Sequence, residues 1–383
     1  KKRFSPVKFP CGGFTAMFSV FSLEKALAEA SLWEEGEELS EKARLCAVGQ
    51  PLVSWFEQHA RDLPWRKEPS PYQVWVSEIM LQQTRVEAVK PYYQRWMKTL
   101  PTIEALAQAE DDVLMKLWEG LGYYRRARNL KAAAQKLCQD YEGRLPRSYE
   151  KLKTLPGIGE YTAGAVASLA FGIPVPAVDG NAMRVVSRLL GSYEDVSLEK
   201  TKKRFAGLLK EAMDKEKPGA FNQGLFEVGA MVCIPRGKPR CEECPLASLC
   251  VAKKKGLWDE LPVKPQKKPR RIEEKTVLVI SNGREVALHK RSDQGLLASL
   301  YEFPNWEGQM LMETPGEAEE MLGLQPGRVC AIWPLGEARH VFSHVEWHMV
   351  GYRIEVIDKL PETWICADFR DLEEKYPIPS AFL

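Results

Sequence analysis

The apolar positions between about residue 44 and residue 232 recur with the spacing of amphipathic helices. Six segments place apolar side chains at positions i, i+3 and i+4, and proline or glycine separates them. We predict helices over 50–60, 72–83, 85–100, 111–122, 127–141 and 203–213. Thr84 and Glu87 have the spacing of a capping box, so we expect Thr84 to cap the third of these helices. Apolar–polar alternation is nearly absent, which predicts a mainly α-helical region.

The pattern changes beyond residue 252. Residues 253–273 are basic and contain prolines, which is typical of an exposed linker. Short β-rich segments separated by turn residues follow at 275–281, 285–291, 329–335, 344–357 and 363–368, and one helical stretch lies at 313–324. We therefore predict an α+β domain over residues 274–383.

The length of 383 residues exceeds one ordinary core and predicts two or three domains. We expect a loosely packed or disordered extension over 1–45, a helical core over 46–232, a cysteine-rich loop over 233–252, and then the linker and the domain described above. The first residues superficially resemble a secretory signal, but no small-x-small cleavage pattern follows their apolar run.

Charge and hydropathy exclude some classes of protein. The formal net charge is only +2, so any affinity for nucleic acid must come from local clustering of charge. No apolar run approaches the roughly 20 residues of a membrane span, and we expect no membrane partner. Five cysteines are scattered singly, as free thiols are in a reducing compartment, so we expect a cytoplasmic protein.

The stretch LPGIGEYTAG at 155–164 places Gly157 and Gly159 between a proline and a helix-forming run. Glycines allow a sharp turn and a close backbone approach, and the N–H groups at the start of the next helix would suit a phosphate. An ordinary connection between two helices explains the same spacing.

Two acidic residues stand in positions that suit chemistry. Glu78 lies on the apolar stripe of the predicted 72–83 helix, where a carboxyl group is costly unless it is paired or protonated. A protonated carboxyl group suits a general acid, although a glutamate at the edge of the stripe fits the pattern too. Asp179 directly precedes a helical run, which fits a helix N-cap as well as a carboxylate facing a cationic sugar.

Four of the nine cysteines are clustered, with seven, two and five residues between them: Cys233, Cys241, Cys244 and Cys250. This spacing indicates a metal site. The residues alone leave both zinc and an iron–sulfur cluster open.

Several motifs follow one another along the chain: LPWR, WVSEIMLQQTRV, WEGLGYYRRARNL, LPGIGEYTAGAV, PAVDGNAMRV and GAFNQGLFEVGAMVC. In these motifs the sequence resembles the adenine DNA glycosylase family of the helix-hairpin-helix superfamily, which includes endonuclease III, over residues 47–383. The resemblance implies a mainly α glycosylase core with the hairpin at about 148–170, an iron–sulfur cluster loop and a C-terminal Nudix-like α+β domain.

The resemblance also implies catalytic roles. Glu78 would protonate adenine and later handle the attacking water, and Asp179 would stabilise the oxocarbenium ion or form a transient adduct. Tyr161 and Asn181 would position these groups. Members that also cleave the DNA strand have a lysine nucleophile where this chain has Tyr161, so the chain is expected to remove the base without a lysine imine.

Further residues are implied to contact DNA. The pocket for the extruded adenine would be lined by Trp65, Arg66, Leu81 and Gln223. The base stack opposite 8-oxoguanine would be entered by Gln83 and Tyr123, with Thr84 and Leu121 nearby. Gly157 and Gly159 would hold a phosphate. The lesion itself would be contacted by Phe342, Ser343 and His344. The region GEAEEMLG lacks the arginine of a working Nudix hydrolase, so the C-terminal domain is expected to recognise the lesion rather than to hydrolyse nucleotides.

The implied cofactors are a [4Fe-4S] cluster on the four clustered cysteines and a monovalent cation at the hairpin. The first gap of the cysteine motif has seven residues here, where the family commonly has six. The implied partner is double-stranded DNA with A:8-oxoguanine or A:G mispairs, bound by a monomer. Alternatives are a bifunctional glycosylase and lyase on oxidised pyrimidines, a non-enzymatic DNA-binding protein, and a nucleotide hydrolase.

Overall fold

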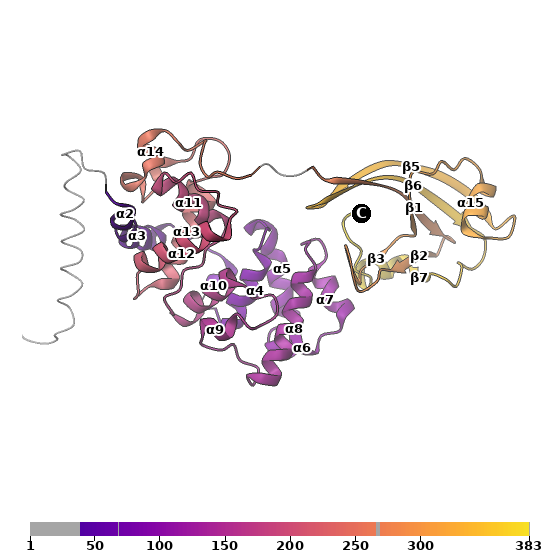
Figure 1. Cartoon of the computed structure of the whole chain (residues 1–383). Coiled ribbons are helices and arrows are strands. Elements are labelled where there is room, and N and C mark those ends of the chain that lie inside the picture. Colours follow the sequence, from indigo (N-terminus) through magenta and orange to yellow (C-terminus); the bar gives the residue numbers. More distant parts are fainter. Residues whose placement is uncertain (1–38, 68, 266–268, 383) are drawn as a thin grey trace, which may run out of the picture. The chain divides into compact units, whose positions relative to one another are not determined.

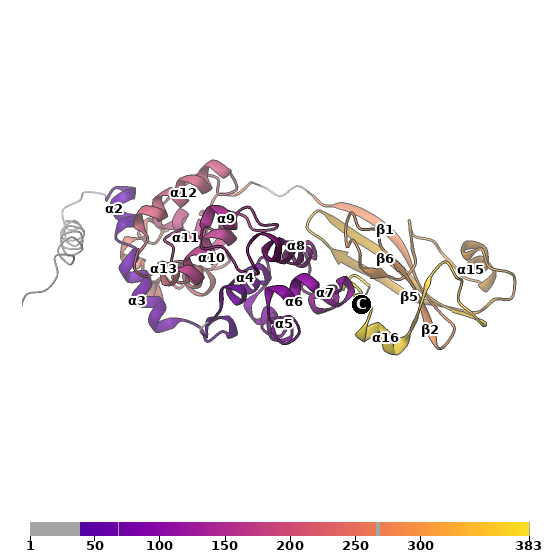
Figure 2. The same cartoon turned by 90° about the horizontal axis from the view of Figure 1, so that it is seen from below.

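The computed structural model describes residues 39–67, 69–265 and 269–382. They form two compact units, whose helices and strands are labelled in Figures 1 and 2. The first unit joins the described residues up to Arg61 with Ala163–Pro265, and the second joins Asp62–Thr162 with the residues after 265. Most of the predicted extension over 1–45 lies outside the described residues, and helix α2 (Glu41–Cys46) occupies its end. None of the described helices is long and apolar enough to cross a membrane.

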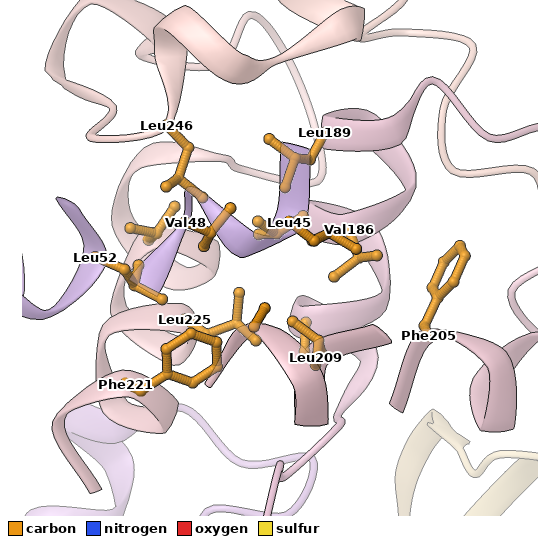
Figure 3. Packing of buried hydrophobic residues seen from close by; sticks show 14 of the residues in the cluster. Leu45, Val48, Leu52, Val186, Leu189, Phe205, Leu209, Phe221, Leu225 and Leu246 are labelled. Carbon is orange, nitrogen blue, oxygen red and sulfur yellow. The ribbon is translucent and has the colours of Figure 1, made fainter. Parts of the chain in front are cut away.

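The first unit combines helices from two distant parts of the sequence. Its longer helices are α3 (Gly49–His59), α11 (Gly180–Leu190), α12 (Glu199–Ala212) and α13 (Pro218–Glu227), which continues into the π-helical turn η3 (Val228–Val232). The cysteine-rich loop contains η4 (Cys241–Glu243), η5 (Ala247–Leu249) and α14 (Val251–Lys255). One apolar core contains side chains from α2 and α3, such as Leu45 and Leu52, and from α11 and α13, such as Val186 and Phe221 (Figure 3).

The helical part of the second unit confirms four of the six predicted helices, although the helix predicted over 111–122 ends already at Trp118. It consists of η2 (Pro64–Arg66), α4 (Pro71–Met80), α5 (Val86–Thr99), α6 (Ile103–Gln108), α7 (Asp111–Trp118), α8 (Arg125–Asp140) and α9 (Tyr149–Leu152). Helix α10 (Glu160–Phe171) begins in this unit and ends in the first. Helix α4 begins sharply, because Ser70 and Gln73 form a capping box and Pro71 occupies the first turn.

The predicted capping box at Thr84 is wrong. Helix α5 has Arg85 as its N-cap and no side-chain cap, and Thr84 Oγ1 instead donates to the Gln82 carbonyl oxygen at 3.3 Å. Helix α4 ends at Met80, earlier than predicted, and Gln83 has a φ of 58°, outside the helical region. The segment between the two helices is therefore a loop with its own hydrogen bonds.

The C-terminal part of the second unit is built on a mixed sheet. Within residues 269–382, seven strands pair in the order β3-β2-β1-β6-β5, with β4 beside β1 and β7 beside β2. Their bounds are β1 Arg271–Ser281, β2 Glu285–Lys290, β3 Tyr301–Glu302, β4 Asn305–Glu307, β5 Val329–Val341, β6 Val345–Val356 and β7 Ile365–Asp368. Figures 1 and 2 show β1, β6 and β5 side by side, and β1 and β6 run parallel.

Two short helices complete this part, α15 (Pro315–Leu322) and α16 (Phe369–Glu374). The predicted helical stretch is confirmed as α15, which Thr314 and Glu317 start with a capping box. The sequence analysis missed β3, β4 and α16, because each is too short to show a period of its own.

Candidate active site and DNA-contacting elements

A buried acid and a tyrosine meet in the second unit. Glu78 lies on α4 with a residue exposure of 4%. Tyr161 lies in the first turn of α10, and its hydroxyl group donates to Glu78 Oε2 at 2.7 Å. A hydroxyl donor satisfies a carboxyl group that water barely reaches and fixes its orientation. The predicted pair of catalytic and positioning residues is thus in direct contact.

The loops after α4 and α7 carry the residues predicted to enter the base stack. Gln83 and Tyr123 have φ values of 58° and 49°, in the left-handed region that residues with a Cβ adopt rarely. Both side chains are exposed, whereas Leu121 is buried and Leu81 and Thr84 are half-buried. The two loops therefore present one exposed side chain each from an unusual backbone conformation.

Trp65 and Arg66 lie in the 3-10 turn η2. The Trp65 side chain is buried, and its ring meets the Tyr93 ring edge-on with 5.4 Å between the centroids. Arg66 is half-buried at the end of the turn. An aromatic anchor thus fixes the segment that carries the arginine.

The hairpin between α9 and α10 depends on Gly157. Its φ is 73°, and a Cβ at this position would lie 2.6 Å from the Asn129 Cβ. Gly159 is exposed and has open space around it. Helix α10 starts at the next residue, so the N–H groups of its first turn lack partners within the helix.

In the first unit, Asp179 is the N-cap of α11, as its position before the helical run suggested. Its Oδ1 accepts from the Ala182 backbone N–H at 2.7 Å, and its Oδ2 accepts from Asn181 Nδ2 at 3.0 Å. Burial raises the pKa of Asp179 above its usual range, while the hydrogen bonds from Ala182 and Asn181 act in the opposite direction. The carboxyl group is fixed at both oxygens by N–H donors.

A buried arginine connects this carboxyl group to the cysteine-rich loop. Arg184 Nη2 donates to Asn181 Oδ1 and to the Gly229 carbonyl oxygen, both at 2.8 Å, and its Nε donates to the Cys233 carbonyl oxygen at 2.9 Å. Asn181 in turn donates to Asp179, so a continuous series of hydrogen bonds joins the two sites. Gln223 is half-buried on α13 of the same unit.

The four clustered cysteines surround one pocket, which Arg188, Lys253 and Trp258 also line. Arg188 Nη1 donates to Cys233 Sγ at 3.3 Å. Burial raises the pKa of the Cys241, Cys244 and Cys250 thiols, that of Cys244 to about 12. Among the described residues, no three candidate ligands converge as closely as a single metal ion requires. The four thiols therefore line one pocket but do not converge on the position of a single metal ion.

The predicted lesion-contacting residues form the turn between β5 and β6. Phe342 is anchored, because its ring meets the Trp347 ring at 4.9 Å and its backbone N–H donates to the Val345 carbonyl oxygen at 2.9 Å. Ser343 and His344 are exposed at the tip. Within the second unit, the Tyr123 hydroxyl and Ser343 Oγ lie 3.0 Å apart. A residue predicted to enter the base stack and a residue predicted to contact 8-oxoguanine are thus in contact.

The structure brings several predicted residues into contact within each unit. Glu78 contacts Tyr161, Asp179 contacts Asn181, and Tyr123 contacts Ser343. Glu78 belongs to the second unit and Asp179 to the first.

The chain is similar to known proteins over most of its length. The family described as HhH-GPD superfamily base excision DNA repair protein matches residues 76–211, and a NUDIX domain matches residues 276–383. The human adenine DNA glycosylase is 34% identical over 380 residues, which cover 84% of this chain and 69% of that protein. The Arabidopsis thaliana adenine DNA glycosylase is 38% identical over 364 residues, which cover 81% of this chain and 57% of that protein.

The chain belongs to the adenine DNA glycosylase family. It is a base excision repair enzyme that acts on DNA, with a helix-hairpin-helix core and a Nudix-like C-terminal domain. A solved structure of a thermostable thymine-DNA glycosylase is 31% identical, with a TM-score of 0.51, and the match covers 55% of this chain and 97% of that one. The glycosylase core is therefore shared, whereas the base that each enzyme removes differs.

Sequence reasoning missed four buried arginines among the described residues of this glycosylase: Arg44, Arg126, Arg184 and Arg188. A signal was present in the periodicity. Arg126 shares the apolar stripe of α8 with Leu130 and Leu137, which lie four and eleven residues further on. A charged residue on an apolar stripe had singled out Glu78, and the same test applied to basic residues would have found Arg126.

Proposed function

We propose that this glycosylase hydrolyses the N-glycosidic bond of adenine mispaired with 8-oxoguanine or guanine. The observation that carries the proposal is the Glu78 carboxyl group, buried on an apolar helix and bonded to the Tyr161 hydroxyl group. A carboxyl group in such surroundings is suited to deliver a proton, and the bond fixes its direction.

The reaction divides between two acidic side chains. Glu78 gives its proton to N7 of the extruded adenine, and the bond from C1′ to N9 breaks with its electron pair leaving on the base. The Asp179 carboxylate stabilises the positive charge of the sugar or forms a transient bond to it. Water then adds to C1′ and returns a proton to Glu78. Asn181 and Tyr161 position the two groups.

The tyrosine at position 161 supports base removal without strand cleavage. Tyr161 has no amine and cannot form an imine with the sugar. Borohydride should therefore trap little or no covalent complex with substrate DNA. Efficient trapping would favour the bifunctional alternative.

We propose that DNA is held by the elements described above. The first turn of α10 and the glycines Gly157 and Gly159 bind a phosphate, together with a monovalent cation. Gln83 and Tyr123 enter the base stack, with Thr84 and Leu121 behind them. The adenine pocket is formed by Trp65, Arg66, Leu81 and Gln223. The enzyme acts as a monomer on double-stranded DNA.

We propose that the C-terminal domain recognises 8-oxoguanine through Phe342, Ser343 and His344. Support comes from two acidic residues of α15, Glu317 and Glu319, whose carboxylates accept from backbone N–H groups outside the helix. Glu317 Oε2 accepts from the Glu313 and Thr314 N–H groups, and Glu319 Oε1 accepts from the Val329 N–H group at 2.8 Å. Carboxylates used in this way are poorly placed to hold the Mg²⁺ of a Nudix hydrolase. Release of pyrophosphate from 8-oxo-dGTP with Mg²⁺ would contradict this assignment.

We also propose that Cys233, Cys241, Cys244 and Cys250 hold a [4Fe-4S] cluster. The shared pocket supports this, because a cluster spreads its ligands around several irons, and Arg188 supplies a donor to a sulfur. When bound, the cluster gives the loop a fixed shape. The purified protein should contain about four irons per chain, and Cys244→Ser should lower this content. Zinc alone on elemental analysis would contradict the assignment.

The substrate proposal is tested with duplexes that carry adenine opposite 8-oxoguanine, guanine or cytosine. Adenine should be released fastest opposite 8-oxoguanine and slowest opposite cytosine. Replacing Ser343 and His344 with alanine should reduce the preference for 8-oxoguanine over guanine. The matched control is Arg284→Ala, which alters an exposed turn of the same domain and should leave the preference intact. Equal rates on all three duplexes would contradict the proposal.

A further inference from the structure

The buried Arg126 guanidinium group bridges two loops of the second unit. Its exposure is 8%. Nη1 donates to the carbonyl oxygens of Ile79, Met80 and Gln82 at 2.9, 2.9 and 2.7 Å. Nη2 donates to Thr84 Oγ1 at 3.3 Å and to the carbonyl oxygens of Leu121 and Gly122 at 3.1 and 3.0 Å. One side chain thus binds the end of α4, the loop that follows it, and the loop before α8.

These acceptors bracket two exposed residues. Gln83 lies between Gln82 and Thr84, and Tyr123 directly follows Gly122. Both have left-handed backbone conformations, which a residue with a Cβ does not keep unless its neighbours hold it. The guanidinium carbon also lies 5.7 Å from the centroid of the Tyr123 ring.

The partners of Arg126 are neutral oxygens, five carbonyls and one hydroxyl. Burial lowers the pKa of Arg126 to about 10, which still leaves the group charged at neutral pH. A buried charge is costly unless several dipoles solvate it, and here the solvating carbonyl and hydroxyl groups belong to the end of α4 and to the two loops. The charge and the conformation of the loops therefore depend on each other.

We propose that Arg126 is a positioning residue that fixes Gln83 and Tyr123 before DNA arrives, so that the two side chains enter the base stack without a further ordering cost. The proposal rests on the proposed function, in which these two residues open the mispair. A side chain held in its working conformation spends less binding energy on ordering. Lysine, with one compact ammonium group, cannot bridge both loops as the planar fork of arginine does.

The test compares full-length Arg126→Lys with the wild type on two duplexes. In the first duplex 2-aminopurine, or adenine, faces 8-oxoguanine, so a base pair must open. In the second it faces an abasic site, so no pair opens. The rise in 2-aminopurine fluorescence reports extrusion, and single-turnover release of adenine reports the reaction. On the paired duplex, we expect Arg126→Lys to lower the extent of extrusion and the rate of adenine release by about tenfold or more. On the unpaired duplex, the rate of adenine release should stay within about threefold of the wild-type rate.

The control is Tyr72→Phe, which removes a buried hydroxyl group that donates to the Leu100 carbonyl oxygen and accepts from Trp96 Nε1, two bonds that involve neither loop. It should lower the melting temperature and leave extrusion at the wild-type level. A second variant, Thr84→Val, removes one of the six acceptors and should fold even where Arg126→Lys does not. We expect it to slow release on the paired duplex alone, by about twofold to fivefold.

The outcomes separate the two proposals. The role of Arg126 alone is overturned if the wild type extrudes 2-aminopurine and the variants extrude it equally well. It is also overturned if the variants lose the same fraction of activity on both duplexes. A wild type that releases no adenine opposite 8-oxoguanine overturns the proposed function instead. Selective loss on the paired duplex supports the positioning role.

Discussion

The two acidic side chains of the proposed active site have opposite surroundings. Glu78 lies on an apolar helix of the second unit and accepts from the hydroxyl group of Tyr161. Asp179 caps a helix of the first unit, and N–H groups of Ala182 and Asn181 hold both of its oxygens. The first setting gives an acid whose hydroxyl partner tolerates either protonation state, and the second fixes the direction of a carboxyl group whose pKa burial raises.

The difference teaches that the role of a carboxyl group follows from its donors. A hydroxyl group can donate to a carboxylate and can also accept from a protonated acid, so the Tyr161 contact survives proton transfer. An N–H group can only donate, so the contacts of Asp179 weaken when it is protonated. The pair can therefore divide acid catalysis and charge stabilisation without exchanging roles.

The strongest test of this comparison is Glu78→Gln. Glutamine keeps the shape and cannot deliver a proton, so adenine release should fall by a factor of about 10³ or more while duplex binding persists. Single-turnover kinetics and an affinity measurement check this. The matched control is Glu319→Gln, a buried glutamate of α15 whose amide oxygen can still accept from Val329. Near-normal release by Glu78→Gln would contradict the role of general acid.

Asp179→Asn should have the next largest effect, a fall in single-turnover rate of about 10²-fold. Asparagine remains a good N-cap and keeps an acceptor for Ala182, so α11 should stay folded. Circular dichroism checks the fold beside the rate. Asp368→Asn, at the N-cap of α16, is the control and should keep full activity. An active Asp179→Asn enzyme would mean that no charge is needed at this position.

Tyr161→Phe should have a smaller effect. It removes the hydrogen bond to Glu78 Oε2 and leaves the acid in place but less well oriented, so we expect a fall in rate of about tenfold. Its pH–rate profile should also move, because the donor that favours the carboxylate is gone. Tyr72→Phe, which removes another buried hydroxyl group, should change neither the profile nor the rate.

The smallest effect concerns stability. Because burial raises the pKa of Asp179, the folded protein holds this proton more tightly than the unfolded chain does. Its contribution to stability is full below about pH 4 and is lost as the pH rises through the higher value of the folded state. Asparagine does not titrate, so the stability of Asp179→Asn relative to the wild type should increase from acid to neutral pH, by less than about 2 kcal/mol. Thermal melts across this range check the trend, and a flat or falling difference would contradict it.

Much of the fold follows from local pattern, and the failures have physical causes. The longer helices could be placed because each carries an apolar stripe, whereas β3 and β4 contain two and three residues and have no period to detect. Thr84 was misassigned because its spacing to Glu87 fits a capping box, while the tertiary contact with Arg126 places its hydroxyl group in the preceding loop. Local spacing does not reveal a competing long-range partner.

The site was predictable in part. Glu78 and Asp179 could be singled out, because a charge on an apolar stripe and an acid before a helix are local signals. The hydrogen bonds from Arg126 to Ile79 and from Arg184 to Cys233 could not be, because they join residues 47 and 49 positions apart. The donor to Glu78 is equally hidden from local pattern, because Tyr161 lies 83 positions away, whereas the donors to Asp179 are its near neighbours Asn181 and Ala182.

The core of the first unit has a consequence for synthesis on the ribosome. Leu45 and Leu52 pack with Val186 and Phe221 (Figure 3), and Leu249 belongs to the same core, so α2 and α3 share a core whose remaining walls are translated much later. At typical elongation rates, roughly 10 to 40 seconds pass between Leu52 and Leu249 leaving the peptidyl-transferase centre. During that interval the apolar faces of α2 and α3 lack their final partners, and exposed apolar surface of this kind is what chaperones bind.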